Sequence, residues 1–138
     1  MKVIKGNHKN LNNFLNKNTC FVGIFSKFCI HCKNMKPQWE SMKKKLKKID
    51  CNAIIIELSI DDHKHINNSE LSQYMLVNGV PSMMIMKNGK INKHYNGNRS
   101  ENDMSNFVLK NINKRKLREK TKKIRHYKQV RTMGRKKL

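Results

Sequence analysis

Residues 20–37 read CFVGIFSKFCIHCKNMKP. The run CFVGIF, residues 20–25, is apolar apart from its glycine and is bounded by polar residues, as expected of a strand that is buried on both faces. Cys29 and Cys32 follow this strand with two residues between them. The stretch therefore predicts a buried strand that leads directly into a C-x-x-C pair.

From Cys32 onward the sequence has the spacing of an amphipathic helix. Apolar side chains recur at steps of three and four residues and form a stripe that can face a core: Met35, Trp39, Met42, Leu46 and Ile49. Pro37 is expected to kink this helix near its start. A second buried strand, AIIIELSI at residues 53–60, comes next. This order implies a right-handed crossover and parallel strands, so we expect the cysteine pair inside a βαβ unit.

The remaining elements are shorter. Residues 2–4 can form an edge strand, and a small helix is expected around residues 11–15. The segment 61–79 reads as a loop followed by a short helix. Residues 80–97 predict two strands joined at Asn88-Gly89, a hairpin signal. A last helix should begin near Ser100, because acidic residues at its first turn suit the helix dipole.

Length and charge divide the chain into two parts. The 138 residues suffice for one domain with a modest core, which we place at residues 1–110. The formal net charge is +22, from 31 basic and nine acidic residues, and residues 110–138 hold 14 of the basic ones. We expect a basic arm at 111–138, helical or partly ordered, that binds a polyanionic partner such as an acidic protein assembly or a nucleic acid.

No stretch of the sequence resembles a targeting or membrane-spanning segment. The first 18 residues lack the apolar run of a signal peptide, and no run of about 18 apolar residues occurs elsewhere. These features predict a cytoplasmic protein that is not exported. Structural disulfides are rare in a reducing compartment, so the C-x-x-C pair should be catalytic or bind a metal.

A cysteine pair that opens a helix has a specific chemical use. The free N–H groups of the first turn and the positive end of the helix dipole stabilise a thiolate on the first cysteine. Cys29 is therefore the expected nucleophile. Cys32, one turn further on, can attack a mixed disulfide on Cys29 and release the product. His31 and Lys33 add positive or polarisable groups beside the thiolate.

Metal binding is the competing interpretation of the cysteines. Zinc needs four ligands, and only Cys20, Cys51 and scattered histidines could complete the set, without a second C-x-x-C. The His63–His65 pair lies in a polar loop, and we assign it no role. We expect no metal. Cys20 and Cys51 stand near the starts of two strands that should be parallel neighbours and could approach each other, although two free thiols in the core are the preferred interpretation.

Two separated stretches resemble the thioredoxin family. FSKFCIHCKNMKP is similar to that family's active-site turn and kinked helix, and GVPSMMIMKNGK is similar to its later strand with a cis-proline. The resemblance covers about residues 1–110 and implies an α/β thioredoxin fold, a central mixed sheet flanked by helices. It also implies a redox-active Cys29–Cys32 disulfide with no other cofactor, a cis Pro81 facing the cysteines, and a Val80 backbone that holds an extended substrate.

The chain departs from the family pattern at the active site. Phe28 replaces the usual Trp, and Ile30-His31 resembles disulfide isomerases and oxidases, so the pair should be less reducing than a typical thioredoxin. We expect five residues around Cys29 to contact the substrate: Phe28, Ile30, His31, Val80 and Pro81. The family's buried acid six residues before the first cysteine is replaced by Gly23.

A compensating acid can be proposed. Glu57 stands where the family often carries a lysine, on the strand expected to neighbour Gly23. Our hypothesis is that Glu57 accepts the proton of Cys32.

The predicted function is thiol–disulfide exchange on protein disulfides. A noncatalytic thioredoxin-fold scaffold or assembly component, anchored by the basic arm, is the main alternative, because a fold does not fix a function. Nucleic-acid binding through the arm alone is a third. The composition, the redox domain and the arm together are also similar to small thioredoxin-like proteins of large DNA viruses, so packaging in a virion is a further expectation.

Overall fold

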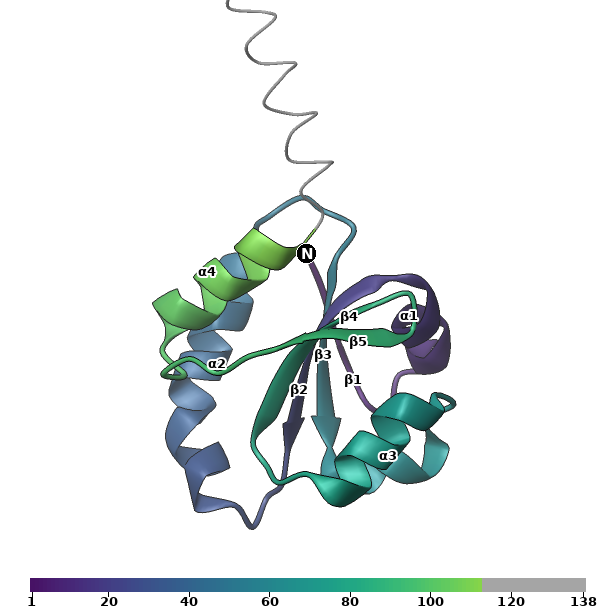
Figure 1. Cartoon of the computed structure of the whole chain (residues 1–138). Coiled ribbons are helices and arrows are strands. Elements are labelled where there is room, and N and C mark those ends of the chain that lie inside the picture. The colour runs from purple at the N-terminus through teal and green to yellow at the C-terminus, as the bar shows by residue number, and fades with distance from the viewer. Residues whose placement is uncertain (113–138) are drawn as a thin grey trace, which may run out of the picture.

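A five-stranded mixed sheet with helices on both faces forms the described part of the chain, residues 1–112 of the computed structural model (Figure 1). The sheet order is β1-β3-β2-β4-β5. Its strands are β1 (Lys2–Lys5), β2 (Thr19–Phe25), β3 (Ile54–Ser59), β4 (Ser82–Lys87) and β5 (Lys90–His94). The helices are α1 (Leu11–Lys17), α2 (Ile30–Lys47), α3 (Ser69–Val77) and α4 (Glu101–Asn111). The α/β fold class predicted from the sequence is confirmed.

The pairing of the strands follows from their connections. β1, β3 and β2 are parallel because helical crossovers join them, whereas β4 runs antiparallel to β2 and to β5. The tight β4–β5 turn uses Asn88 and Gly89, whose φ angles of 50° and 83° lie in the left-handed region that these residue types tolerate. The cysteine pair therefore lies at the carboxyl end of a central strand, β2.

The sheet separates two hydrophobic cores. Residues of α2 and α4 pack on one face, and residues of α1 and α3 pack on the other (Figure 1). Cys20 belongs to the α1/α3 core, whereas Cys51 contacts the α2/α4 core. All four cysteines are free thiols. The two cysteines that could have approached each other therefore lie on opposite faces of the sheet.

One element differs from the sequence expectation. Residues 60–65, read as a loop, form a 3-10 helix, η1 (Ile60–His65). Its signal is polar: the Ser59 hydroxyl accepts the Asp61 N–H at 3.4 Å, and the Asp62 carboxylate accepts the Ser59 N–H at 2.7 Å. A capping box consists of polar residues, so a search for regularly spaced apolar residues does not find this helix.

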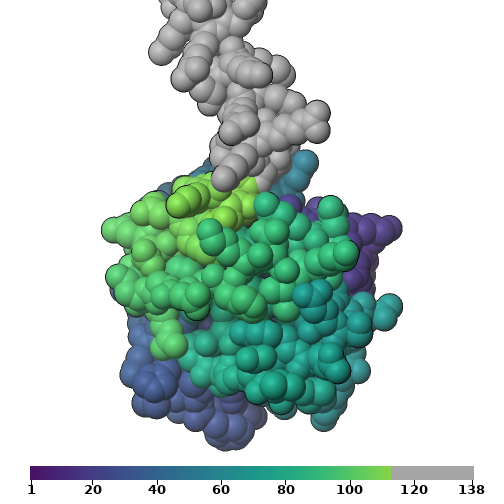
Figure 2. All heavy atoms as spheres, viewed as in Figure 1, coloured from purple at the N-terminus to yellow at the C-terminus, as the bar shows by residue number. Residues whose placement is uncertain are grey.

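The predicted basic arm lies almost entirely outside the described residues. α4 ends at Asn111, and Ile112 is still buried, with 1% of its surface exposed. Residues 113–138 are drawn in grey in Figures 1 and 2. Within residues 1–112, no helix is long and apolar enough to cross a membrane.

Candidate active site

The cysteine pair sits where β2 passes into α2. Cys29 is the N-cap of α2, with extended backbone angles, and its Sγ accepts a hydrogen bond from the Cys32 N–H at 3.2 Å. A sulfur at this position satisfies one of the free N–H groups of the first helical turn. The same geometry stabilises negative charge on that sulfur, because the helix dipole points its positive end at it.

The two thiols have opposite electrostatic environments. A hydrogen bond from the Cys32 thiol, helped by the backbone N–H groups of Cys32 and His31 and by the charge of Arg99, lowers the pKa of Cys29. Burial and the interaction with Cys29 raise the pKa of Cys32 to about 11. Cys29 is partly exposed whereas Cys32 is buried. The arrangement favours the thiolate form at Cys29 and the protonated form at Cys32.

The loop before β4 closes one side of the site. The Val80–Pro81 peptide bond is cis, and the Cys29 thiol lies 3.6 Å from the Val80 carbonyl oxygen, to which it donates. The other residues expected to contact substrate lie beside this junction. Phe28 and Ile30 are 86% and 63% exposed, and His31 is also exposed. The structure thus brings together the five residues that the sequence proposed for substrate contact.

Glu57 lies beside Gly23, as the strand alignment predicted, and it is held in a polar cluster. The two residues are register partners in the β2–β3 pair. Glu57 Oε1 accepts hydrogen bonds from Trp39 Nε1 at 2.6 Å and from Lys43 Nζ at 2.9 Å. Burial works to raise the pKa of Glu57, but the bonds from Lys43 and Trp39 outweigh it, so that the pKa is lowered. Glu57 is therefore a carboxylate at neutral pH.

The indole of Trp39 also explains why position 23 is glycine. A Cβ atom added at Gly23 would lie 2.5 Å from Trp39 Cη2 and 2.8 Å from the ring of Phe25. Carbon atoms make favourable contact only near 3.5–4.0 Å. Two aromatic rings thus occupy the space that an acidic side chain at this position would need.

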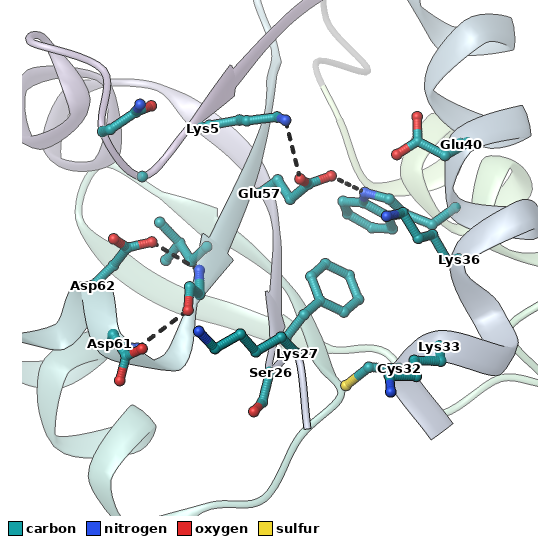
Figure 3. A pocket seen from close by; sticks show the side chains of 16 residues that line it. Lys5, Ser26, Lys27, Cys32, Lys33, Lys36, Glu40, Glu57, Asp61 and Asp62 are labelled. Carbon is teal, nitrogen blue, oxygen red and sulfur yellow. Dashed lines mark hydrogen bonds and ion pairs between the residues drawn. The ribbon is translucent and has the colours of Figure 1, made fainter. Parts of the chain in front are cut away.

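Glu57 and Cys32 line the same pocket without touching each other. The pocket has a volume of about 570 Å³, and Figure 3 shows Cys32 and Glu57 on different sides of it. Lysine side chains from three elements complete its walls: Lys5, Lys27, Lys33 and Lys36. A water molecule occupies about 30 Å³ in the liquid, so water can fill the gap between thiol and carboxylate.

Arg99 is a residue of the site that the sequence did not reveal. It lies in the loop before α4 with φ = 62°, an unusual angle for a residue other than glycine, and its charge lowers the pKa of both Cys29 and Cys32. Its N–H donates to Tyr95 Oη at 3.1 Å, and Tyr95 Oη donates to Asp103 Oδ2 at 2.5 Å. These contacts fix the loop on α4.

The sequence did not reveal the roles of two residues that bind Glu57, Trp39 and Lys43. Trp39 was interpreted as packing, and it is buried, but its indole N–H also binds Glu57. Lys43 went unnoticed within a run of lysines. Its position four residues after Trp39 places both on one face of α2, and this spacing is a signal that could have identified it.

Histidines and acids do not gather into a ligand set in the part of the chain that the structure describes. No group of three or more His, Cys, Asp or Glu side chains there could hold a metal ion. His65 Nε2 instead lies 3.1 Å from the Gly6 carbonyl oxygen and 3.3 Å from Asp62 Oδ1. These contacts tie η1 to the end of β1.

The sequence is similar to those of known proteins at low identity. The chain is 29% identical over 91 residues to a thioredoxin domain-containing protein of Theileria parva, covering 66% of this chain and 38% of that protein. It is 32% identical over 99 residues to protein disulfide-isomerase like 2-2 of Arabidopsis thaliana, covering 71% of this chain and 20% of that one. The chain therefore spans well under half the length of these relatives.

Solved structures and a family model agree with these matches. The first thioredoxin domain of mouse protein disulfide-isomerase A4 matches with a TM-score of 0.58 and 26% identity, over 78% of this chain and 72% of that one. The oxidised thioredoxin of Plasmodium falciparum shares the fold, with a TM-score of 0.53 and 18% identity over 80% of this chain and 96% of that one. The thioredoxin family model matches residues 2–110, so the chain belongs to the thioredoxin family.

Proposed function

We propose that the protein is an oxidoreductase that exchanges its dithiol with disulfides of protein substrates. The observation that carries this proposal is the pairing of Cys29 Sγ with the Cys32 N–H at 3.2 Å, which stabilises a thiolate on the exposed side of the pair. Relatives of the thioredoxin and disulfide-isomerase type support the same chemistry. No cofactor beyond the Cys29–Cys32 pair is required for it.

The reaction proceeds by two sulfur displacements. The Cys29 thiolate attacks one sulfur of the substrate disulfide, forming a mixed disulfide and releasing the other sulfur as a thiolate, which takes up a proton. Cys32 then loses its proton and attacks Cys29 Sγ, forming the Cys29–Cys32 disulfide and releasing the second substrate thiol. Two electrons pass from the dithiol to the substrate. The reverse sequence oxidises a substrate dithiol.

Cysteine variants test this proposal. Reduction of insulin with dithiothreitol as electron donor should be lost in Cys29→Ser, and Cys32→Ser should accumulate the mixed disulfide. Cys51→Ser is the matched control, because this thiol lies in a loop outside the site. If wild type and Cys29→Ser both left insulin unreduced in this assay, the scaffold alternative anchored by the basic arm would be favoured instead.

We further propose that Glu57 receives the proton of Cys32 through water in the pocket. Its lowered pKa keeps the carboxylate ionised at neutral pH, and both groups line the pocket. A general base typically contributes 10² to 10⁴ in rate, so we expect Glu57→Gln to slow resolution of the mixed disulfide about tenfold or more. The attack by Cys29 should change little.

Rapid quenching in acid followed by mass spectrometry separates the mixed disulfide from the released product. Rates of both steps are measured between about pH 5 and pH 9, a window that includes the ordinary pKa of a thiol near 8.5. Asp61→Asn is the control, because Asp61 is an exposed carboxylate on the same pocket. A resolution step with an unchanged pH profile in Glu57→Gln would remove Glu57 from the mechanism.

A further inference from the structure

The large hydrophobic side chains left exposed within residues 1–112 lie on two short segments, one that flanks Cys29 and one that ends three residues before Val80. They are Phe28, Ile30, Leu76 and Val77, between 63% and 86% exposed. Phe28 and Ile30 flank Cys29 directly. Leu76 and Val77 form the end of α3, and Val77 is three residues before Val80, whose carbonyl oxygen lies 3.6 Å from Cys29 Sγ. Three residues of chain span at most about 11 Å, so the end of α3 lies within about this distance of Val80.

Positive charge surrounds this apolar surface. Lys27 Nζ lies 5.3 Å from the ring centroid of Phe28, and His31, Lys33 and Lys36 are exposed on the first turns of α2. The loop with Arg99 adds a further cation whose charge reaches both thiols. No Asp or Glu occurs in residues 1–39 or 71–100, the parts of the chain that supply the two segments and this loop.

The carboxylates nearest to the site share its pocket with Lys27, Lys33 and Lys36, but most of them already have partners within the protein. In the pocket beyond Cys32, Glu40 and Glu57 are both paired with Lys43. Asp62 accepts the Ser59 N–H and pairs with His65, whereas Asp61 is exposed. Glu101 begins α4, and its N–H binds Gln38. Three of the four pocket carboxylates are thus engaged within the protein, and the residues that flank Cys29 directly, Phe28 and Ile30, are apolar.

We propose that this surface selects protein disulfides whose cysteine has apolar neighbours and acidic residues beyond them. The inference rests on the proposed thiol–disulfide exchange and names its substrate class. Apolar side chains next to the substrate cysteine contact the two exposed pairs, and carboxylates further along meet the lysines. The net charge of +22 acts in the same direction, because it attracts acidic partners from a distance.

A second copy of the chain is a poor occupant of the same surface. A symmetric contact places each patch against its own copy, so the lysines of one copy would face those of the other. Like charges brought together across an interface oppose association. Charge complementarity thus favours an acidic segment of another protein.

Synthetic peptides can test the preference. Each contains one cysteine bound as a mixed disulfide to thiopyridine, a neutral leaving group whose release is followed by absorbance. One set keeps leucine and valine beside the cysteine and varies the outer residues among glutamate, serine and lysine. A further peptide keeps the glutamates and replaces the apolar neighbours by serine. Bis(2-hydroxyethyl) disulfide, small and uncharged, reports the reactivity of the dithiol itself.

The full-length reduced protein should react with the glutamate peptide about tenfold or more faster than with the lysine peptide at low salt. This ratio should fall to within about twofold at 0.5 M salt, where charges are screened within a few ångströms. Loss of the apolar neighbours should slow the reaction at both salt concentrations. Equal rates for the glutamate and lysine peptides at low salt would overturn the inference.

Variants locate the effect on the surface. Lys27→Glu with Lys33→Glu should abolish or invert the preference for glutamate peptides. The double variant Lys87→Glu with Lys90→Glu makes the same charge change and should keep most of the preference for glutamate peptides. Lys87 pairs with Thr19, at the end of β2 that is far from Cys29. Leu76→Ser with Val77→Ser should reduce the advantage of apolar neighbours, and their exposure means that the core is untouched. The reverse pattern, with Lys87 and Lys90 controlling the preference, would contradict the proposed location.

Bis(2-hydroxyethyl) disulfide distinguishes a failure of the proposed function from a failure of the proposed substrate preference. If the wild-type protein fails to reduce bis(2-hydroxyethyl) disulfide, the proposed function is wrong. If it reduces that compound but treats all peptides alike, the function stands and the selectivity does not. A dimer formed through this face at assay concentration, seen by light scattering, would likewise overturn the choice of occupant.

Discussion

Single residues of the site differ in how far the sequence could reveal them. Cys29 and Cys32 were identified because two residues of spacing and the adjacent strand are local features. Arg99 was not, because it lies far along the chain and reaches the thiols only through the loop that Tyr95 and Asp103 hold. Contacts of that kind depend on the packing of α4, which no periodicity encodes.

Removing the charge of Arg99 should raise the pKa of both active-site thiols. The guanidinium lowers the pKa of Cys29 and of Cys32, so Arg99→Gln takes a stabilising cation away from each thiolate. The rate of alkylation of Cys29 by iodoacetamide, measured against pH, should shift to higher pH. Lys93→Gln removes an exposed cation from β5 and serves as control. Coincident profiles for wild type and Arg99→Gln would exclude this role.

The Glu57 carboxylate should also contribute to stability in a pH-dependent way. Its pKa is lower in the folded chain than in the unfolded one, so its contribution is present above the unfolded value of about 4.3 and is lost as pH falls through the folded value. Glu57→Gln leaves Lys43 buried without this partner and should cost about 1–3 kcal/mol at pH 7.

Urea denaturation at a series of pH values measures this difference. The gap between wild type and Glu57→Gln should narrow steadily below about pH 4, where the wild-type carboxylate takes up its proton. A gap that stays constant down to pH 2 would show that the effect is one of packing rather than of charge.

At the level of elements, the sequence predicted the position of helices and strands better than their polar details. β2, β3 and α2 carry long apolar runs or stripes, and all were found. η1 was missed because its capping box is built from Ser59 and Asp62, which look like loop residues. The missing acid at Gly23 was noticed, but its cause lies in the packing of α2 on β2, where Trp39 fills the space.

Substitution of Gly23 tests whether the packing of α2 on β2 excludes a larger residue at this position. Gly23→Ala places a methyl group against the rings of Trp39 and Phe25, and overpacking of this kind costs about 1–3 kcal/mol. Gly79→Ala is the matched control, because nothing lies within 4 Å of an added Cβ there, and it should stay within about 1 kcal/mol of wild type. Chemical denaturation of both variants decides the point, and equal stabilities would show that the rings move aside freely.

For the whole molecule, topology was more predictable than the placement of groups across the sheet. The right-handed crossover fixed β2 and β3 as parallel neighbours, and the Asn88-Gly89 turn fixed β4 and β5 as a hairpin. The separation of Cys20 from Cys51 was not predictable, since it depends on which face each residue occupies. Cys51 lies in the loop before β3, so the alternation of side chains along a strand does not determine its face.

The charge of the whole chain should determine its binding to polyanions. A truncation after Asn113 removes most of the terminal basic residues and keeps Ile112, which is buried in the core. Affinity for heparin, and the slope of its logarithm against that of salt concentration, should both fall, since fewer counterions are released. Reduction of bis(2-hydroxyethyl) disulfide should be unaffected. A truncated protein that binds heparin with the full salt slope would assign the interaction to residues 1–113.

The contact between Gly23 and the Trp39 indole bears on how such a protein can evolve. An acid at position 23 requires smaller residues at positions 25 and 39, yet a change at position 39 deprives Glu57 of its indole donor. Each single substitution therefore gives a protein in which either position 23 is overcrowded or Glu57 lacks one of its hydrogen-bond donors. Descendants are expected to exchange the glycine, the tryptophan and the glutamate as a linked set, and grafting any one of them alone into a homologue should fail.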